Sequence, residues 1–341
     1  MDQRLHRWSQ LNRWKHERLL DTRLCDLPIE LESSWVSPLI DKVRNELSMR
    51  GLRVRPHFYF ADEWFSPENV PGVALPFYLG HGRLMRLERK MMLEVEGGTR
   101  GECLRLIRHE LGHAVQHAYR LHRRRRWQQM FGNATARYPD YYRPRPASRD
   151  YVVHLDGWYA QSHPVEDFAE TFAVWLDPRS GWRTRYRGWP ALKKLEYLDE
   201  TMRELSGVVP PVRSRMRPYA LSTLRHTLSK HYEKRREHYD IGYTDRYDRD
   251  LLRVFDPKGR GEKAAVFLRR HRRVLRTQVA RRTGGHDFTV DQVFKEMTGR
   301  CRELRLGLNG ARPERKKAEF ATMLATHTMY TLHQPAEWRA V

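Results

Sequence analysis

Long apolar runs and cysteine are both scarce in this sequence. No stretch of 18 consecutive apolar residues occurs, which excludes a membrane-spanning helix. The three cysteines, Cys25, Cys103 and Cys301, lie far apart, so they form neither a disulfide scaffold nor a paired metal-binding motif. Residues 1–20 lack the apolar segment of a secretory signal. We therefore expect a cytoplasmic protein that does not associate with membranes.

Acidic residues are also in the minority, and lysine is rare beside arginine. Lys and Arg total 64 against 42 Asp and Glu, a net charge of +22, of which +15 falls after residue 200. Clustered Arg and Lys side chains are typical of a nucleic-acid-binding surface. However, arginine outnumbers lysine 52 to 12, a bias that a GC-rich coding sequence produces unaided. Nucleic acid is therefore an alternative partner, which the sequence does not favour.

The length of 341 residues suggests about two domains. The composition changes after the stretch 207–211, which contains two prolines, and the residues that follow have a helical, weakly amphipathic pattern. We expect residues 1–205 to form one domain and residues 206–341 to form a helical, strongly basic region.

A small mixed sheet among many helices is the architecture that we expect, which makes the fold class α+β and mainly α. Residues 53–60 and 72–79 have strand composition, but Pro56 and Pro76 confine them to sheet edges. An edge strand at 72–79 could bind an extended peptide. The stretch 127–158, rich in Tyr, Pro and Arg, is too long for a plain connector, which favours a functional excursion.

A helix is predicted from about residue 100 to about Arg125. Thr99 and Glu102 have the spacing of a capping box, which opens a helix. The Arg123–Arg126 run would then lie at the helix C-terminus, where positive charge complements the helix dipole. Apolar residues recur at intervals of three or four along one stripe, at Leu104, Ile107, Leu111, Val115 and Ala118.

This predicted helix carries an HExxH motif, His109-Glu110-Leu111-Gly112-His113. The composition alone would give about 0.06 such matches in a chain of this length. Residues four apart on a helix have Cβ atoms about 5–6 Å apart, so both imidazoles can reach one ion. Glu110 lies beside them, where it can accept a proton from a metal-activated water. The motif predicts a metal site with His109 and His113 as ligands and Glu110 as the general base.

A zinc site of this kind needs a third protein ligand and one open position. His117 continues the histidine ladder but lies about 12 Å along the helix axis from the first histidine of the motif. Better candidates occur in a second predicted helix that starts at His163, where Glu166 and Glu170 flank an apolar face. We assign Glu166 as the third ligand and Glu170 as the carboxylate that orients a ligating histidine. The reverse assignment and Asp167 remain alternatives.

These residues resemble the gluzincin metallopeptidases, whose pattern is HExxH, a downstream glutamate and a second acidic residue four positions later. In those families the first glutamate binds zinc and the second acid supports a histidine, which favours Glu166 as the ligand. Glu170 replaces the aspartate of the thermolysin type, so the chain is more similar to the lethal-factor branch. In that branch a tyrosine seven residues before the ligand glutamate helps to stabilise the oxyanion, and Tyr159 has that position here.

Three longer segments resemble bacterial proteins described as putative zinc-binding metallopeptidases. The segments are HELGHAVQHAYRLHRRRRW, HLDGWYAQSHPVEDFAETFAVWL and RYRGWPALKKLEY. This resemblance implies a zincin-like metallopeptidase domain over residues 1–205, with one Zn²⁺ per chain. It carries more information about the metal and the fold than about the substrate.

The ligand set and the resemblance together imply hydrolysis of a peptide or amide bond in a peptide or protein substrate. Glu110 would take a proton from the zinc-activated water and return it to the leaving amine. Tyr159 would donate a hydrogen bond to the oxyanion, with His154 and His163 as alternative donors. Two other functions remain open. One is a basic nucleic-acid or polyanion-binding protein with structural zinc, and the other is a non-proteolytic regulatory module on a zincin fold.

Overall fold

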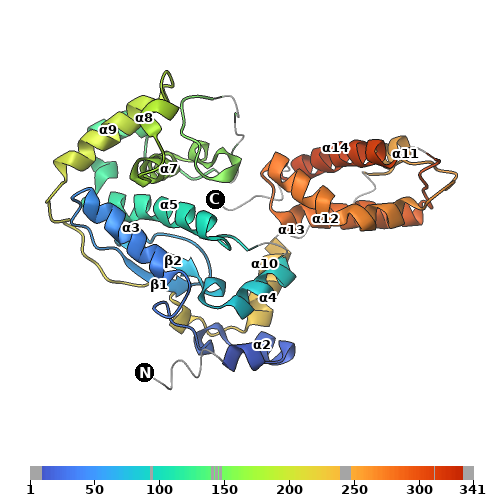
Figure 1. The fold of residues 1–341 in the computed structure, drawn as a ribbon, viewed down its shortest axis with the longest axis horizontal. Coiled ribbons are helices and arrows are strands. Elements are labelled where there is room, and N and C mark those ends of the chain that lie inside the picture. The colour runs from blue at the N-terminus through green and yellow to red at the C-terminus, as the bar shows by residue number, and fades with distance from the viewer. Residues whose placement is uncertain are drawn as a thin grey trace. The chain divides into compact units, whose positions relative to one another are not determined.

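The computed structural model describes residues 10–92, 95–139, 142, 145, 148–238, 247–310 and 312–332 (Figure 1). Contacts divide these residues into a first unit, 10–91 and 95–232, and a second unit, which comprises Met92 and the described residues from Glu233 onward. Helices dominate both units, and one small sheet lies in the first, which agrees with the expected α+β, mainly α class. Among the described residues, no helix combines the length and the apolarity needed to cross a membrane.

The regular elements of the first unit alternate with short 3-10 turns. Its strands and α-helices are β1 (His57–Ala61), β2 (Gly72–Pro76), α2 (His16–Asp21), α3 (Ser37–Met49), α4 (Gly82–Met92), α5 (Arg100–Tyr119), α6 (Arg125–Phe131), α7 (Pro164–Leu176), α8 (Trp182–Arg185) and α9 (Ala191–Glu204). Helix α10 (Leu228–His238) begins in the first unit and ends in the second. The second unit continues with α11 (Asp248–Val254), α12 (Ala264–Thr283), α13 (Asp287–Glu303) and α14 (Pro313–Leu332).

The sheet is a parallel pair of strands, with His57 opposite Gly72. Both strands are shorter than the predicted segments because the prolines limit them. Pro56 precedes β1, and after Pro76 the chain turns into a 3-10 helix, Phe77–Gly80. Every residue of both strands is buried, so this sheet is part of the core of the first unit.

The edge of β2 that faces away from β1 is covered from Gly72 to Ala74. The amide of Ala74 donates to the carbonyl of Phe65, which forms an antiparallel bridge. The hydroxyl of Ser66 donates to the carbonyl of Gly72. Backbone polar groups of a strand point alternately to its two edges. The Ala74 amide and the Gly72 carbonyl therefore both face away from β1, and an added peptide strand would need these same two groups. The expectation of a free peptide-binding edge at 72–79 is therefore wrong for Gly72 to Ala74.

Helix α5 is the central helix of the first unit and contacts α7, α3 and β2 (Figure 1). It begins as predicted, because the Thr99 hydroxyl accepts the amide hydrogen of Glu102 and the Glu102 carboxylate accepts that of Thr99. It ends earlier than predicted, at Tyr119, because Arg120 adopts a left-handed conformation with φ of 53°. The Arg123–Arg126 run therefore does not lie at the C-terminus of this helix. The prediction that its positive charge complements the helix dipole there is wrong.

The contact boundary between the units falls at residues 232–233, whereas the sequence suggested 205–206. The difference arises because the segment after α9 returns to the first unit. The hydroxyl of Tyr59 donates to the carbonyl of Pro218, and His57 Nε2 lies 2.7 Å from the carbonyl oxygen of Met216. Further along, Thr227 pairs with Arg23 in an antiparallel bridge. The two side-chain bonds to carbonyls fasten the segment to β1, and the backbone bridge fastens it to the N-terminal part of the unit.

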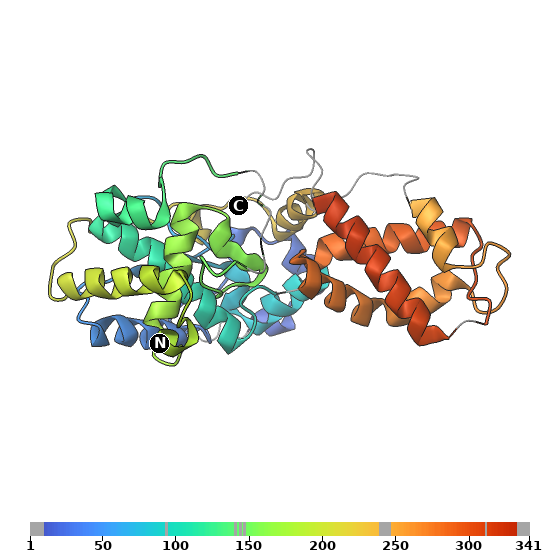
Figure 2. The ribbon, with the colours of Figure 1, turned by 90° about the horizontal axis from the view of Figure 1, so that it is seen from above.

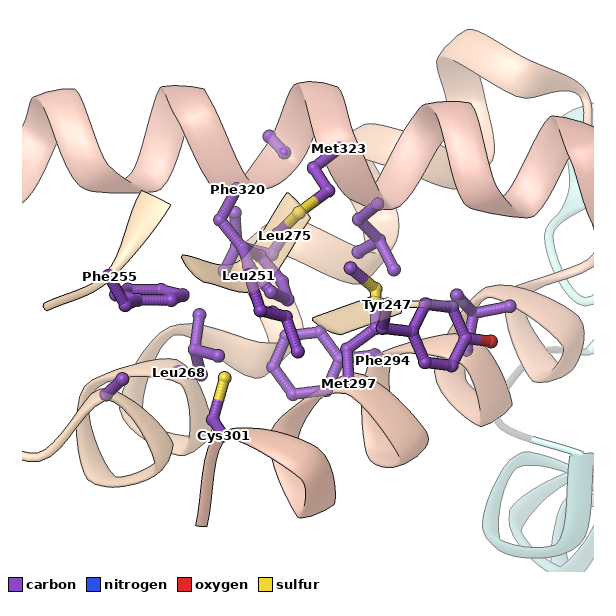
Figure 3. Packing of buried hydrophobic residues seen from close by; sticks show 14 of the residues in the cluster. Tyr247, Leu251, Phe255, Leu268, Leu275, Phe294, Met297, Cys301, Phe320 and Met323 are labelled. Carbon is purple, nitrogen blue, oxygen red and sulfur yellow. The ribbon is translucent and has the colours of Figure 1, made fainter. Parts of the chain in front are cut away.

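The second unit has its own hydrophobic core, built by α12, α13 and α14, which pack against one another (Figure 2). Phe320 on α14 contacts Phe294 on α13 edge to face, with ring centroids 5.6 Å apart. Figure 3 shows these side chains together with Met297 of α13 and Leu275 of α12 in the same cluster. The predicted helices in this region are present, and their apolar faces point inward.

Candidate metal centre

Helices α5 and α7 bring the predicted metal ligands together, although the residues are more than 50 positions apart in the sequence. The Nε2 atoms of His109 and His113 lie 3.2 Å apart. Glu166 Oε2 lies 3.1 Å from each of these nitrogens. This is the one set of three or more His, Cys, Asp or Glu residues in the described chain whose ligand atoms converge closely enough to hold an ion.

The size and chemistry of this triangle fit a zinc ion. Zinc bonds of about 2.0–2.1 Å in a tetrahedral site place neighbouring ligand atoms about 3.3 Å apart, close to the distances found here. Two imidazole nitrogens and one carboxylate oxygen are the donor set of many catalytic zinc sites. The His113 side chain is the most exposed of the three at 12%, against 4% for His109 and 6% for Glu166. Solvent therefore lies nearest to the His113 side of the centre.

Glu170 lies behind the triangle and contacts the other ring nitrogen of His109. His109 Nδ1 donates to Glu170 Oε1 at 2.8 Å, so in the neutral imidazole the lone pair of Nε2 is directed at the centre. The second oxygen of Glu170 accepts the amide of Leu155 at 2.8 Å, so the buried carboxylate is satisfied on both sides. This is the arrangement that the sequence predicts for a carboxylate that orients a ligating histidine.

Charges in the buried triangle shift the pKa values of its members. Burial alone would lower the pKa of His109, but the hydrogen bonds and charges of Glu166 and Glu170 outweigh it and hold this pKa well above its ordinary value. Burial alone would raise the pKa of Glu166, yet His113 and His109 hold it well below the usual range. Without metal, the site is therefore an internal ion pair, and a bound cation must displace a proton from it.

Glu110 lies next to the triangle without taking part in it. Its Oε2 atom is buried and has no hydrogen-bond partner among the described residues. Burial raises the pKa of Glu110, His109 and His113 oppose this shift, and Glu166 adds to it. A buried carboxylate with a raised pKa is suited to exchange a proton near neutral pH. An unsatisfied buried oxygen is rare in folded proteins, which marks Glu110 as a candidate functional group.

Tyr159, the predicted oxyanion donor, lies beside His109, one of the predicted metal ligands. Its ring centroid is 5.6 Å from that of His109, and burial raises the pKa of its hydroxyl well above the ordinary value. The chain reaches this position through a kink in which both Gly157 (φ 77°) and Trp158 (φ 56°) are left-handed. A left-handed tryptophan is unusual and costs conformational energy, so the surrounding contacts must enforce this turn.

The two alternative oxyanion donors are engaged elsewhere. His154 Nε2 donates to the carbonyl of Arg105 at 3.0 Å, and burial lowers the pKa of this histidine. His163 is the N-cap of α7, where Nδ1 accepts the amide of Val165 and Nε2 donates to the carbonyl of Ala136. Neither histidine has a free donor directed at the triangle.

Two further candidates lie outside the triangle. Asp167 forms a 2.6 Å ion pair with Lys194, and burial, opposed by Lys194, raises the pKa of this aspartate to about 7. His117 lies on α5 beyond the motif, with its ring 5.8 Å from that of His122, and burial lowers its pKa to about 3. Neither residue joins the three that converge on a common point.

The structure adds one residue that the sequence reasoning missed. The hydroxyl of Tyr138 donates to Oε1 of Glu166 at 2.8 Å. The only signal in the sequence was that Tyr138 lies in the Tyr-rich stretch 127–158, which was expected to be a functional excursion. Residues 140–141, 143–144 and 146–147 of that stretch lie outside the described chain.

Comparisons with known proteins identify the segment that contains this site. No curated protein and no solved structure matches the chain. Residues 93–201 match one family model, and this segment includes α5, α7 and all residues of the triangle. Over residues 93–201, the chain is similar to the family described as "Putative zinc-binding metallo-peptidase".

Proposed function

We propose that the first unit is a zinc-dependent metallopeptidase that hydrolyses peptide or amide bonds. His109, His113 and Glu166 would hold one Zn²⁺, and Glu110 would act as the general base. The observation that carries this proposal is the convergence of three side-chain N and O atoms within 3.1–3.2 Å beside Glu110, whose buried Oε2 atom has no hydrogen-bond partner among the described residues. A purely structural site needs ligands but has no use for the neighbouring base.

Each side chain has a separate task in this proposal. A zinc ion supplies Lewis acidity, which activates water and polarises a substrate carbonyl. Glu110 would accept a proton at Oε2, the atom that has no partner, and would release it to the leaving amine. Glu170 would keep His109 in the tautomer that binds metal through Nε2. Tyr159 would donate a hydrogen bond to the negative oxygen that develops on the substrate.

Two wider expectations belong to the same proposal. A zincin-like fold is supported by an HExxH helix that contacts both a small sheet and a second helix bearing the glutamate. A reducing, cytoplasmic location is supported by the three free thiols, of which Cys103 and Cys301 are buried.

Metal analysis of three proteins tests the ligand set. We expect about one zinc per chain in the wild type, loss of zinc in Glu166→Ala, and zinc binding weakened about 10–100-fold in Glu170→Ala. Loss of zinc in Glu170→Ala, with only weakened binding in Glu166→Ala, would instead assign Glu170 as the ligand and Glu166 as the orienting carboxylate. A wild-type protein that takes up no zinc after reconstitution would overturn the proposal. Digestion of a mixed peptide library, read by mass spectrometry, then tests for hydrolysis.

A second candidate function, nucleic-acid binding, is favoured by the charges of the second unit. In its described residues from 247 to 310 and 312 to 332, every acidic side chain has an intramolecular partner. Arg269, Arg273 and Arg281 on the exposed side of α12 have no carboxylate partner in that part of the chain. They extend over about 18 Å of helix, so their charges are available to phosphates.

The salt dependence of binding to a labelled duplex tests this second function. We expect the variant with Gln at 269, 273 and 281 to bind more weakly and with a shallower salt slope than the wild type. The matched control replaces Arg253, Arg260 and Arg315, which are exposed but each paired with a carboxylate. Equal losses in the two triple variants would show only an effect of net charge and would contradict a specific surface on α12.

A further inference from the structure

We propose that Tyr138 is a positioning residue that determines which oxygen of Glu166 faces the metal. This inference rests on the proposed function and adds a residue to its site. The two oxygens of Glu166 have different partners: Oε2 lies 3.1 Å from the Nε2 atoms of His109 and His113, while Oε1 accepts the Tyr138 hydroxyl at 2.8 Å. The carboxylate therefore presents a single oxygen to the histidines.

The Tyr138 bond has a direct chemical consequence for the ligand. A carboxylate can bind a cation through one oxygen or through both, and a hydrogen bond to one oxygen favours binding through the other. Glu166 is almost completely buried, so Oε1 would otherwise lack a polar partner at considerable cost. Tyr138 satisfies that oxygen and fixes the rotation of the carboxylate group. The remaining coordination position is then left for water or substrate.

Tyr138 is held in place by the residue that caps helix α7. Its ring stacks on the His163 imidazole, with centroids 3.8 Å apart and an angle of 12° between the planes. His163 caps α7 through the amide of Val165 and also donates to the carbonyl of Ala136, two residues before Tyr138. One imidazole thus links the start of the helix that carries Glu166 to the segment that carries Tyr138. The distance between hydroxyl and carboxylate is set by this link.

The two tyrosines near the centre have distinct positions. Tyr159 lies against the ring of His109, where a hydroxyl could meet a substrate oxygen. Tyr138 is bonded to the outer oxygen of a ligand and is 39% exposed as a residue. Its role is exerted through Glu166, and it need not contact substrate.

Zinc affinity in a Tyr138→Phe variant tests this proposal, with zinc itself as the probe. Competition with a chelator of known affinity should show a loss of about tenfold or more relative to the wild type. The matched control is Tyr142→Phe, which removes a hydroxyl from the same stretch that donates to the Gly157 carbonyl and not to a ligand. We expect the control to retain wild-type zinc affinity. Thermal unfolding of the metal-free proteins checks that both variants fold.

Cobalt substitution supplies a readout that a merely structural role would not change. The visible absorption of bound Co²⁺ responds to the number of donor atoms, so we expect Tyr138→Phe to alter the spectrum and Tyr142→Phe to preserve it. His163→Asn should also weaken zinc binding, because asparagine can cap α7 but cannot stack on Tyr138. Wild-type affinity in His163→Asn would overturn the role of the stack.

Two results separate this inference from the proposed function. Equal zinc affinity and equal cobalt spectra in Tyr138→Phe and Tyr142→Phe would overturn the positioning role alone, with the metal site intact. Failure of the wild type to bind either ion would overturn the proposed function and, with it, the role of Tyr138.

Discussion

Gly112 lies directly against Ala169 where helices α5 and α7 cross. A Cβ atom on Gly112 would be 2.7 Å from the Cα of Ala169 and 3.0 Å from its carbonyl oxygen. Both neighbours belong to the backbone of α7, which cannot move aside as a flexible side chain could. The glycine of the HExxH motif therefore permits the helix contact that brings Glu166 to His109 and His113.

Replacement of Gly112 by alanine should separate the two helices. We expect a loss of about 1–3 kcal/mol in unfolding free energy, because the added methyl group overpacks a buried contact. Zinc binding should weaken as well, since the ligands lie on both helices. The control is Gly101→Ala on the same helix, where a Cβ would meet nothing within 4 Å. That change should stabilise the protein by about 0.5–1 kcal/mol. Equal stability of the two variants would contradict the close crossing.

Glu110→Gln should separate metal binding from hydrolysis. Glutamine keeps the size of the side chain but cannot accept the proton, so peptide hydrolysis should fall about 10²–10⁴-fold. The zinc content should remain near one per chain, because Glu110 is not part of the triangle. Elemental analysis and a peptide-cleavage assay on the same preparation measure both quantities. Full activity in this variant would exclude Glu110 as the base.

The stability of the metal-free protein should depend on pH through the buried triangle. The pKa of His109 is raised, so its contribution is complete below the unfolded value of 6.5 and is lost as pH rises through the folded pKa. The pKa of Glu166 is lowered, so its contribution is complete above 4.5 and is lost as pH falls through the folded pKa. The triangle should therefore stabilise the metal-free fold most between about pH 4.5 and 6.5.

Zinc affinity should show the opposite trend above that range. In the proposed site zinc would bind deprotonated His109, so affinity should increase as pH rises toward and through the raised pKa. Thermal unfolding of metal-free protein and chelator competition, both measured against pH, check the two trends. In Glu170→Gln, which removes one of the charges that raise the pKa of His109, both dependences should become weaker. Unchanged profiles in that variant would contradict the coupling of Glu170 to His109.

Arg108→Ala should strongly destabilise the first unit. The Arg108 guanidinium donates to both oxygens of Glu46, at 2.9 and 2.7 Å, and also pairs with Asp177. Its loss leaves the buried Glu46 carboxylate without its cation, which should cost about 3–5 kcal/mol in denaturant unfolding. Arg124→Ala is the matched control, because its pair with Glu204 is solvent-exposed and should contribute less than about 1 kcal/mol. Similar effects in the two variants would argue against a buried network.

Local patterns in the sequence predicted the two helices of the site. The cap formed by Thr99 and Glu102 and the start of α7 at His163 follow short-range rules, and the structure has both. The convergence of Glu166 with the histidines could be expected only because the motif demanded a third ligand. Its role as that ligand, like the roles of Glu170 and Tyr159, stays a prediction.

Contacts between distant segments could not be predicted in the same way. The bond from Tyr138 to Glu166 joins residues 28 apart through an irregular segment, where no periodicity indicates direction. The end of α5 at Tyr119 could not be predicted, because it depends on the left-handed conformation of Arg120. A glycine at that position would have indicated a helix end, whereas an arginine does not. The segment after α9 returns to β1 through bonds from the His57 and Tyr59 side chains to backbone carbonyls, which composition does not reveal.

The contacts of Arg108 and of the segment after α9 determine how far the chain can be truncated without loss of the residues that support the candidate metal centre. The family match ends at residue 201 and begins after α3, yet α3 supplies Glu46 to the buried network. The segment up to residue 232 covers β1 through Met216 and Pro218. A fragment trimmed to the matched residues would contain all three predicted metal ligands but would lack the α3 and post-α9 contacts that support their helices. We therefore expect that a truncated protein which retains the candidate metal centre must extend at least from α2 to Tyr232.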